Sequence, residues 1–388
     1  MRLRINQKVL EKALAHANWI IEKKQAIPIL GYILFEAEVG KGLKITATNM
    51  DMTIVDTIAC DVEIAGKYCL PASLLYDITR KIKSGSEISI EYTEHDNSIK
   101  LTSNKASFSI HYMESDGFPP ITEAKYDVTF PMKTKILQKA IDVAKVAMLQ
   151  DNSRFHLNGI HMHYENEQGN SKLRFVATDL FRISCISASA PAEVQNMHPI
   201  IVSKRTVGEI LRLIDGSGDE MVNISISENR ISFELISSEN IKTEFCARLI
   251  NGTFPEYKAA VEVANDKILT TDTAEFIEAL DRVSTVVVDS TSSVKLRITP
   301  DKLMLSGVSQ ELGSAREEIE ANFQGAEQLE ICFNSRYLLE ILKEIETPQV
   351  QLRLAGSNSS TIIEPVASDK TPNIDMVFAV MPIEILTN

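Results

Sequence analysis

The 388-residue sequence predicts an α+β protein built from three tandem repeats of one fold. A strand-like stretch that ends in ATD, Lys172–Ile183, has a weak copy at Leu43–Met52 and a weaker one at Leu303–Leu312. Equivalent leucines recur every 130 residues, at Leu43, Leu173 and Leu303, which is about a third of the chain. Self-similarity at a fixed period is the sequence signature of repeated structural units.

Each third contains two amphipathic helical patterns. The first recurs at residues 7–24, 134–149 and 272–283, and the second at 73–83, 203–214 and 335–345. Apolar residues recur in these segments at three- and four-residue spacing, which is typical of a helix with one buried face. Thr134 and either Thr271 or Asp272 are of types that commonly precede a first helical turn.

Alternating apolar and polar residues follow the second helix of each third. Residues 88–103, 224–237 and 350–365 therefore predict antiparallel hairpins. Hairpins combined with segregated helices indicate an α+β unit. Phe-Pro segments at 117–125 and 253–261 precede the junctions, so the expected domains are 1–127, 128–263 and 264–388.

Composition is that of an ordinary globular protein, with 44% hydrophobic and 24% charged residues. No uncharged apolar run is long enough to cross a bilayer, and the first residues lack an apolar signal core. The five cysteines form no C-x-x-C pair, so buried free thiols are expected. These features predict a cytoplasmic protein without a membrane partner.

The net charge of −13 argues against a nucleic-acid partner if it is spread evenly. The six predicted helices, however, carry 16 Lys and Arg against 11 Asp and Glu. A solvated polar face explains any single basic helix, but repetition favours a shared surface for phosphate contact. The helix at 272–283 breaks the pattern, because Asp272, Glu275, Glu278 and Asp281 outnumber Arg282.

Motifs for catalysis are missing from the sequence. It contains no P-loop, G-x-G-x-x-G, G-x-S-x-G or H-E-x-x-H. His161 and His163 could converge on one face of a strand, with His156 nearby, but no thiolate or carboxylate motif completes a metal site. Asp179 is better interpreted as a turn cap than as a catalytic acid. We therefore predict no enzyme, no metal and no cofactor.

An apolar run, Val377–Ile385, lies just before the C-terminus. Such a run normally closes a core as a last strand. Pro382 would end that strand and leave Met381 and Ile383 free to line a surface groove. A groove of this kind suits a short peptide with apolar anchors.

Six segments together resemble the bacterial sliding clamp family, the beta subunit of DNA polymerase III. They are QAIPILGYILFEA (25–37), FSIHYMESDGFPPI (108–121), SRFHLNGI (153–160), ATDLFRIS (177–184), NGTFPEYKAAV (251–261) and VFAVMPIEI (377–385). The resemblance spans the whole chain in the family's order. It implies three DNA-clamp domains, with antiparallel sheets outside and two helices per domain inside, in a ring-shaped head-to-tail homodimer.

The function that the resemblance implies is that of a non-enzymatic processivity factor. Such a ring encircles duplex DNA without regard to sequence, slides along it and tethers the replicative polymerase. Implied partners are double-stranded DNA, a second copy, the polymerase III alpha subunit, the clamp loader, and other polymerases and repair proteins that carry Gln-Leu-x-Leu-Phe motifs. The alternatives are a DNA-modifying enzyme using the basic helices and a pure protein-binding scaffold.

The resemblance also assigns residues to three surfaces. The peptide pocket would be formed by Leu157, Thr178, Leu180, Phe181, Arg182, Ile183, Pro255, Val380, Met381, Pro382 and Ile383. Lys24 and Gln150 match DNA-contacting positions, and the basic helices add Arg80, Lys81, Lys139, Lys145, Lys204 and Arg205. The dimer contact would join Phe108 and Ile110 to the segment 284–288, which contains Thr285 and Val286.

The sequence departs from the family at the rim of the expected pocket. Leu180 and Phe181 stand where a small residue and then an imidazole or phenol are usual. Ala259 lies where an Arg is usual, and Glu384 replaces a basic residue. We expect the apolar pocket to persist, with Arg182 as the cation at its rim. We also expect acidic peptides to bind this chain less well than typical relatives.

Overall fold

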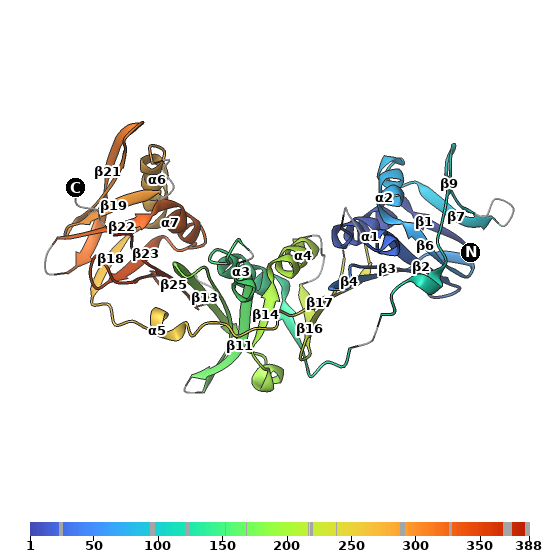
Figure 1. The fold of residues 1–388 in the computed structure, drawn as a ribbon, viewed down its shortest axis with the longest axis horizontal. Helices are drawn as coiled ribbons and strands as arrows, with labels where there is room; N and C mark the ends of the chain where they lie inside the picture. The colour runs from blue at the N-terminus through green and yellow to red at the C-terminus, as the bar shows by residue number, and fades with distance from the viewer. Residues whose placement is uncertain are drawn as a thin grey trace. The chain divides into compact units, whose positions relative to one another are not determined.

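The structure of the protein is a computed structural model. It describes residues 1–22, 26–93, 98–121, 124–151, 153–167, 169–215, 217, 220–237, 239–287, 292–325, 328–367 and 375–384. The chain forms two compact units, Met1–Gln138 with Arg205–Leu249, and Lys139–Lys204 with Ile250–Asn388. Figure 1 labels the helices and strands of both units.

Unit 1 contains two antiparallel sheets. The smaller has the order β5-β1-β7-β8-β9, with β1 at Arg2–Asn6, β5 at Asp61–Ile64, β7 at Glu87–Thr93, β8 at Ser98–Ser103 and β9 at Ala106–Ile110. The larger has the order β10-β15-β16-β17-β4-β3-β2-β6. Its strands are β2 Tyr32–Glu38, β3 Gly42–Thr48, β4 Met52–Ile58, β6 Gly66–Pro71, β10 Val128–Lys133, β15 Met221–Ile226, β16 Arg230–Ile236 and β17 Lys242–Arg248.

Unit 2 contains one long antiparallel sheet, in the order β14-β11-β12-β13-β25-β24-β23-β18-β21-β20-β19-β22. Strands from the middle third are β11 Gly159–Glu167, β12 Asn170–Thr178, β13 Arg182–Ser189 and β14 Ile200–Ser203. Strands from the last third are β18 Lys267–Asp272, β19 Ser293–Ile298, β20 Lys302–Ser309, β21 Gly313–Gln324, β22 Leu329–Asn334, β23 Gln349–Leu354, β24 Thr361–Pro365 and β25 Asp375–Val380.

Two strand pairs join consecutive thirds of the chain. In the first seam β17 pairs with β4, so that Phe245 lies opposite Ile54. In the second seam β13 pairs with β25, so that Ser184 lies opposite Phe378. Because Phe245, Ile54 and Phe378 are all buried, both seams belong to the core as well as to the hydrogen-bonded ladder.

The two helical patterns of each third are confirmed as helices. They are α1 Gln7–Ile20, α2 Ala72–Lys81, α3 Thr134–Lys145, α4 Lys204–Asp215, α6 Thr273–Ser284 and α7 Ser335–Leu342, with an additional short α5 at Lys258–Val261. Asp272 caps α6, because its side chain accepts the Glu275 N–H at 2.9 Å. In unit 1 α1 packs against α2, and in unit 2 α6 packs against α7 (Figure 1).

The repeat is visible at the level of individual hydrogen bonds in the turn that follows β3 and β12. Thr48 and Thr178 donate their hydroxyls to the carbonyls of Met52 and Arg182, at 2.9 and 2.8 Å. Asn49 and Asp179 each accept two backbone N–H groups through their side chains, which confirms Asp179 as a turn cap. The residue after each cap is left-handed, with φ of 76° at Met50 and 77° at Leu180.

The third copy of this turn has a different local structure. Its strand β20 runs on to Ser309, whose hydroxyl accepts the backbone N–H groups of Glu311 and Leu312 at 3.4 and 3.3 Å. Gly313 then adopts the left-handed conformation, with φ of 101°. The weak sequence match at Leu303–Leu312 thus reflects a retained strand and a different turn.

All five cysteines are free, and Cys69, Cys185 and Cys332 are buried as the sequence predicts. Cys60 and Cys246 are only half-buried. Burial raises the pKa of the Cys60 and Cys69 thiols to about 11. Among the described residues, no helix combines the length and the apolar character needed to cross a membrane.

Candidate functional site

The second seam brings together two segments that the sequence assigns to one pocket. Arg182, the first residue of β13, lies opposite Val380, the last residue of β25. One residue further out, the N–H of Met381 donates to the carbonyl of Phe181 at 2.9 Å. The turn at Thr178–Ile183 and the chain that leaves β25 therefore lie side by side.

Three apolar side chains at this seam are exposed to solvent. Leu180 is 47% exposed, Phe181 61% and Met381 47%. We call these three residues the seam cluster. The other segments expected in the pocket contribute half-buried apolar residues beside it, namely Ile183, Pro255, Pro382 and Ile383. Exposed apolar residues that lie together in this way form a candidate surface for a partner.

The remaining apolar residues expected in the pocket are buried in the core of unit 2 or pack against it. Leu157 is fully buried in a core that also contains residues of the last third, Ile362 and Ala379. Ile183 packs against the same core. Val380 is fully buried, and Thr178 is buried by the turn that it stabilises. The expected pocket residues therefore divide into a rigid support and an exposed apolar surface.

Arg182 differs from its predicted role as a cation at the rim. Its side chain is only 7% exposed, and its Nε donates to Asp179 Oδ2 at 3.0 Å. Nη1 lies 2.6 Å from Glu340 Oε2, and the guanidinium lies 4.2 Å from the ring centroid of Tyr337. A buried charge needs such partners to compensate for lost hydration. The prediction was wrong because it could not anticipate these two residues of α7.

Tyr337 and Glu340 are therefore residues of the site that sequence reasoning missed. They lie one helical turn apart on α7, more than 150 residues along the chain from Arg182. Burial, reinforced by the negative charge of Asp179, raises the pKa of the Tyr337 hydroxyl. The pattern of α7 alone indicates an ordinary amphipathic helix, so no local signal identifies them.

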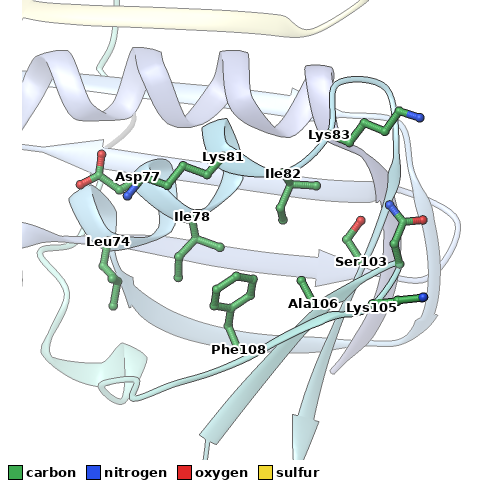
Figure 2. A pocket seen from close by; sticks show the side chains of 11 residues that line it. Leu74, Asp77, Ile78, Lys81, Ile82, Lys83, Ser103, Lys105, Ala106 and Phe108 are labelled. Carbon is green, nitrogen blue, oxygen red and sulfur yellow. The ribbon is translucent and has the colours of Figure 1, made fainter.

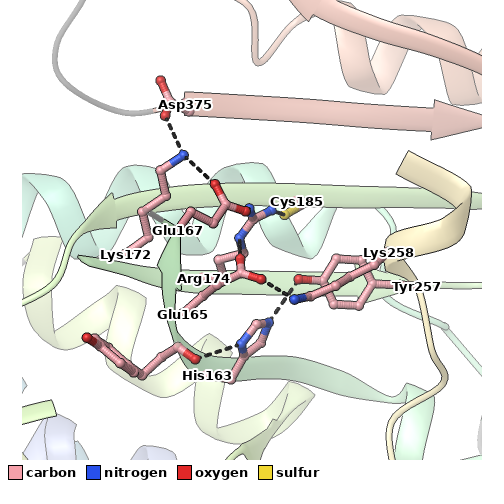
Figure 3. A network of polar contacts seen from close by, with 10 residues as sticks. His163, Glu165, Glu167, Lys172, Arg174, Cys185, Tyr257, Lys258 and Asp375 are labelled. Atoms are coloured by element: carbon pink, nitrogen blue, oxygen red, sulfur yellow. Dashed lines mark hydrogen bonds and ion pairs between the residues drawn. The ribbon is translucent and has the colours of Figure 1, made fainter. Parts of the chain in front are cut away.

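A polar network behind the second seam ties the Phe-Pro segment to the sheet (Figure 3). The buried Arg174 on β12 forms ion pairs with Glu165 and with Glu167, the latter at 2.7 Å. Lys258 on α5 pairs with Glu165 from the other side. Burial acts to raise the pKa of Glu165, but the hydrogen bond from Lys258 and the charge of Arg174 outweigh it, so that this pKa is lowered.

The same network reaches the last strand. Lys172 bridges Glu167 and Asp375, at 3.5 and 3.2 Å, and Asp375 is the first residue of β25 (Figure 3). The network therefore holds β25 to the sheet at the end opposite to the seam cluster.

His161 and His163 converge on β11, as their spacing predicts, with ring centroids 5.0 Å apart. His161 stacks on Phe254 at 4.6 Å, and His163 Nε2 lies 2.9 Å from the Tyr257 hydroxyl. Among the described residues, no group of three or more His, Cys, Asp or Glu could hold a metal ion. The pair thus anchors the Phe-Pro segment, and burial lowers the pKa of both rings, that of His161 to about 4.

Unit 1 has a pocket of about 500 Å³ beside its edge strand β9 (Figure 2). The expected dimer residue Phe108 lines it together with Leu74 and Ile78 of α2, while Ile110 on the same strand is buried. Lys81, which the sequence assigns to DNA, also lines this pocket, with Lys83 and Lys105. The pocket therefore has an apolar floor and a basic margin.

The partner edge expected from the sequence lies at the end of α6. Thr285 is exposed and Val286 half-buried, directly after the last helical residue Ser284. Residue 288 lies outside the described residues. The neighbouring strand β21 pairs with β20 along Gly313–Glu320, and it pairs with β18 only along Ala321–Gln324. Along Gly313–Glu320, one edge of β21 therefore has no strand partner in the described chain.

Most of the residues predicted to contact DNA already have a polar or charged partner within the chain. Lys139 is mostly buried between Glu344 and Glu346, and Arg205 pairs with Glu22 at the end of α1. Arg80 pairs with Asp77, and Lys145 with Asp142, each one helical turn away. Lys204 donates to the side chain of Gln150. Lys24 lies outside the described residues.

Three repeats of two helices and antiparallel strands, joined by strand pairing at both seams, define the class of DNA clamps. Models of three domains match the chain in order: the N-terminal domain of the DNA polymerase III beta subunit at residues 1–122, the central domain at 131–256 and the C-terminal domain at 263–379. The chain belongs to this family, the bacterial beta sliding clamps, which are non-catalytic processivity subunits of DNA polymerase III.

Individual relatives support the assignment over the whole chain. The beta sliding clamp of Caulobacter vibrioides is 33% identical over 94% of this chain and 96% of its own length, and that of Pseudomonas putida is 27% identical over 99% and 100%. A C. crescentus clamp structure, with PEG at a region proposed there to tether beta-motifs, is 32% identical with a TM-score of 0.91. A Bartonella birtlesii clamp bound to griselimycin is 30% identical with a TM-score of 0.90. Each structural match covers 99% of this chain and 100% of the other.

We predict that His161 makes stability depend on pH. The pKa of His161 is lowered from 6.5 to about 4 in the fold, so between these values the unfolded chain binds a proton that the folded chain does not. Stability from this group is therefore complete above pH 6.5 and is lost as the pH falls toward 4. Urea unfolding of His161→Phe, which keeps an aromatic ring against Phe254, should show a weaker fall in midpoint between pH 7 and 4.5 than wild type.

The control for this prediction is His198→Phe, because His198 is an exposed histidine. Its pH dependence should match that of wild type. Carboxylates titrate in all three proteins, so the comparison isolates the histidine. An unchanged pH dependence in the His161 variant would contradict the prediction.

Proposed function

We propose that this chain forms a head-to-tail dimeric ring that slides on duplex DNA and tethers its partners by peptides bound at the seam cluster. The observation that carries the proposal is the backbone hydrogen bond from Met381 to Phe181, which brings the exposed side chains of Leu180, Phe181 and Met381 to one seam. Partners would be the polymerase III alpha subunit, the clamp loader, other polymerases and repair proteins. We also propose domain limits of 1–127, 128–263 and 264–388, and a cytoplasmic location.

The size of the seam cluster fits a short linear motif. Burying a Leu-Phe pair supplies roughly 3–6 kcal/mol, at about 1.5–3 kcal/mol for each side chain, before the cost of ordering the peptide. A micromolar dissociation constant corresponds to about 8 kcal/mol, so a bound peptide would need backbone contacts in addition to this pair. Such an affinity allows partners to exchange while the ring keeps each of them at a high local concentration.

The peptide site is tested by Met381→Ala combined with Leu180→Ala. Titration of a Gln-Leu-Ser-Leu-Phe peptide should show affinity reduced by about tenfold or more, because two apolar contacts are truncated. The matched control is Met50→Ala, since Met50 occupies the equivalent left-handed position in the first repeat and is 53% exposed. Equal affinities for wild type and the double variant would place the site elsewhere.

The dimer contact is supported by two unpaired strand edges and by charge. In the described chain β9 pairs only with β8, and Gly313–Glu320 only with β20. Exposed edges of this kind invite pairing with another chain. The pocket next to β9 carries Lys81, Lys83 and Lys105, whereas α6 and β21 carry mainly carboxylates. Placing the acidic end of one copy against the basic edge of another would satisfy both.

Phe108→Asp should therefore weaken the dimer, because it places a carboxylate on the apolar floor of the pocket. Light scattering at micromolar concentration should give a dimer for wild type and mainly monomer for the variant. Val39→Asp, in an exposed turn of the same unit, introduces the same charge and should remain dimeric. A wild-type protein that is only monomeric would refute the ring.

Retention on DNA should be topological, because the six helical segments carry only a small excess of cations, 16 Lys and Arg against 11 Asp and Glu, which is too little for tight static binding. Loaded protein should remain on a nicked circle and leave after linearisation, whereas a pure protein-binding scaffold would not distinguish the two. Replacing Lys24 and Arg80 by Ala should reduce loading without dissociating the dimer, since an exposed arginine such as Arg80 contributes little to folding. The same loss of wild-type protein from circular and linear DNA would exclude a ring.

A further inference from the structure

Helix α7 places a carboxylate directly beside the seam cluster. Glu340 has a side chain that is 53% exposed, and its Oε2 lies 2.6 Å from Nη1 of the buried Arg182. Arg182 follows Phe181 in the chain, and Phe181 is joined to Met381 by a backbone hydrogen bond. Glu340 is therefore linked to the seam cluster through Arg182.

The charge of Arg182 is already balanced by two carboxylates. Asp179 holds its Nε, and Glu340 faces its Nη1, so the group of three carries a net negative charge. Glu384, exposed just beyond Ile383, adds a second negative charge to the same seam. A ligand that approaches this surface consequently meets anions, even though a guanidinium lies beneath them.

The two carboxylates that hold Arg182 are not equivalent. Asp179 also accepts the backbone N–H groups of Phe181 and Arg182, so it is fixed by the turn. Glu340 extends from a helix, is half-exposed, and makes an ion pair that lacks hydrogen-bond geometry, which leaves the buried Nη1 without a hydrogen-bond acceptor among the described residues. Glu340 is therefore the group that controls whether Arg182 can interact with a ligand.

We propose that Glu340 is a specificity-determining residue of the seam cluster, which selects apolar linear motifs with a neutral or basic residue between their anchors and rejects acidic ones. This inference rests on the proposed peptide site and names the chemistry of its partners. A peptide carboxylate would be repelled by Glu340, and to reach Arg182 it would have to displace Glu340 from its ion pair. A serine meets no such opposition, and a lysine is attracted.

The test compares three peptides that differ at one position, Gln-Leu-Ser-Leu-Phe, Gln-Leu-Asp-Leu-Phe and Gln-Leu-Lys-Leu-Phe. Wild type should bind the Asp peptide most weakly. Glu340→Gln keeps the shape of the side chain and removes its charge, so affinity for the Asp peptide should rise about fivefold while that for the Ser peptide stays within about twofold. The gain should shrink at high salt, because partly exposed charges are screened.

Glu346→Gln is the matched control, since Glu346 is an exposed carboxylate of the same unit that pairs with Lys139 instead. It should leave the ranking of the three peptides unchanged. Thermal unfolding of both variants should stay close to wild type, which separates a specificity role from a merely structural one.

Three results would overturn the inference. The first is an equal change for all three peptides in Glu340→Gln, which would indicate an effect on the shape or stability of the site. The second is no change for any peptide, which would leave the proposed site intact but remove Glu340 from it. The third is the absence of any peptide binding to wild type, which would refute the peptide site and with it this role.

Discussion

Antiparallel backbone pairing across the two seams is the constraint on which the rest of this structure depends. The β17–β4 and β13–β25 ladders turn neighbouring thirds of the chain into continuous sheets. Pairing sets the register, and register decides which side chains face outward. A slip of one residue in β13–β25 would exchange buried and exposed positions, so the geometry of the seam cluster follows from this ladder.

The turn at the proposed binding site has nearly the same backbone as its copy in the first repeat. The turns after β3 and β12 share their threonine hydrogen bonds, their side-chain caps and a left-handed third residue. In the first copy Met52 is buried where the second has Arg182, whose guanidinium reaches the ring of Tyr337. The same turn therefore serves as ordinary structure at one seam and as the centre of the proposed site at the other.

The sequence predicts the elements of this fold well, because each depends on local periodicity. The amphipathic helices, the hairpins and the cap at Asp179 all follow from residues close in the chain. The grouping of Leu180 with Met381 was predicted from family resemblance, because nothing local indicates that β13 and β25 pair.

Interactions that depend on tertiary packing were beyond sequence reasoning. Glu340 forms an ion pair with Arg182, and the ring of Tyr337 lies against its guanidinium; both residues come from α7, which is distant in the sequence. His161 and His163 were correctly placed together, but their partners come from the Phe-Pro segment, which periodicity leaves unassigned. Helix α6 is acidic, unlike the other helices of the repeat. In the proposed dimer its carboxylates would face the lysines at the margin of the β9 pocket of the other copy.

The compact units of this chain do not coincide with its repeats. The middle third gives β10 and β15–β17 to one unit and β11–β14 to the other. Cooperative unfolding depends on which elements contact one another and not on the sequence repeat. The middle repeat, whose strands belong to two different units, therefore cannot unfold as an independent domain. Amide hydrogen exchange would then divide the middle repeat between two protected blocks, and an excised middle repeat would expose the edges of β17 and β13 that pair with β4 and β25 in the described chain.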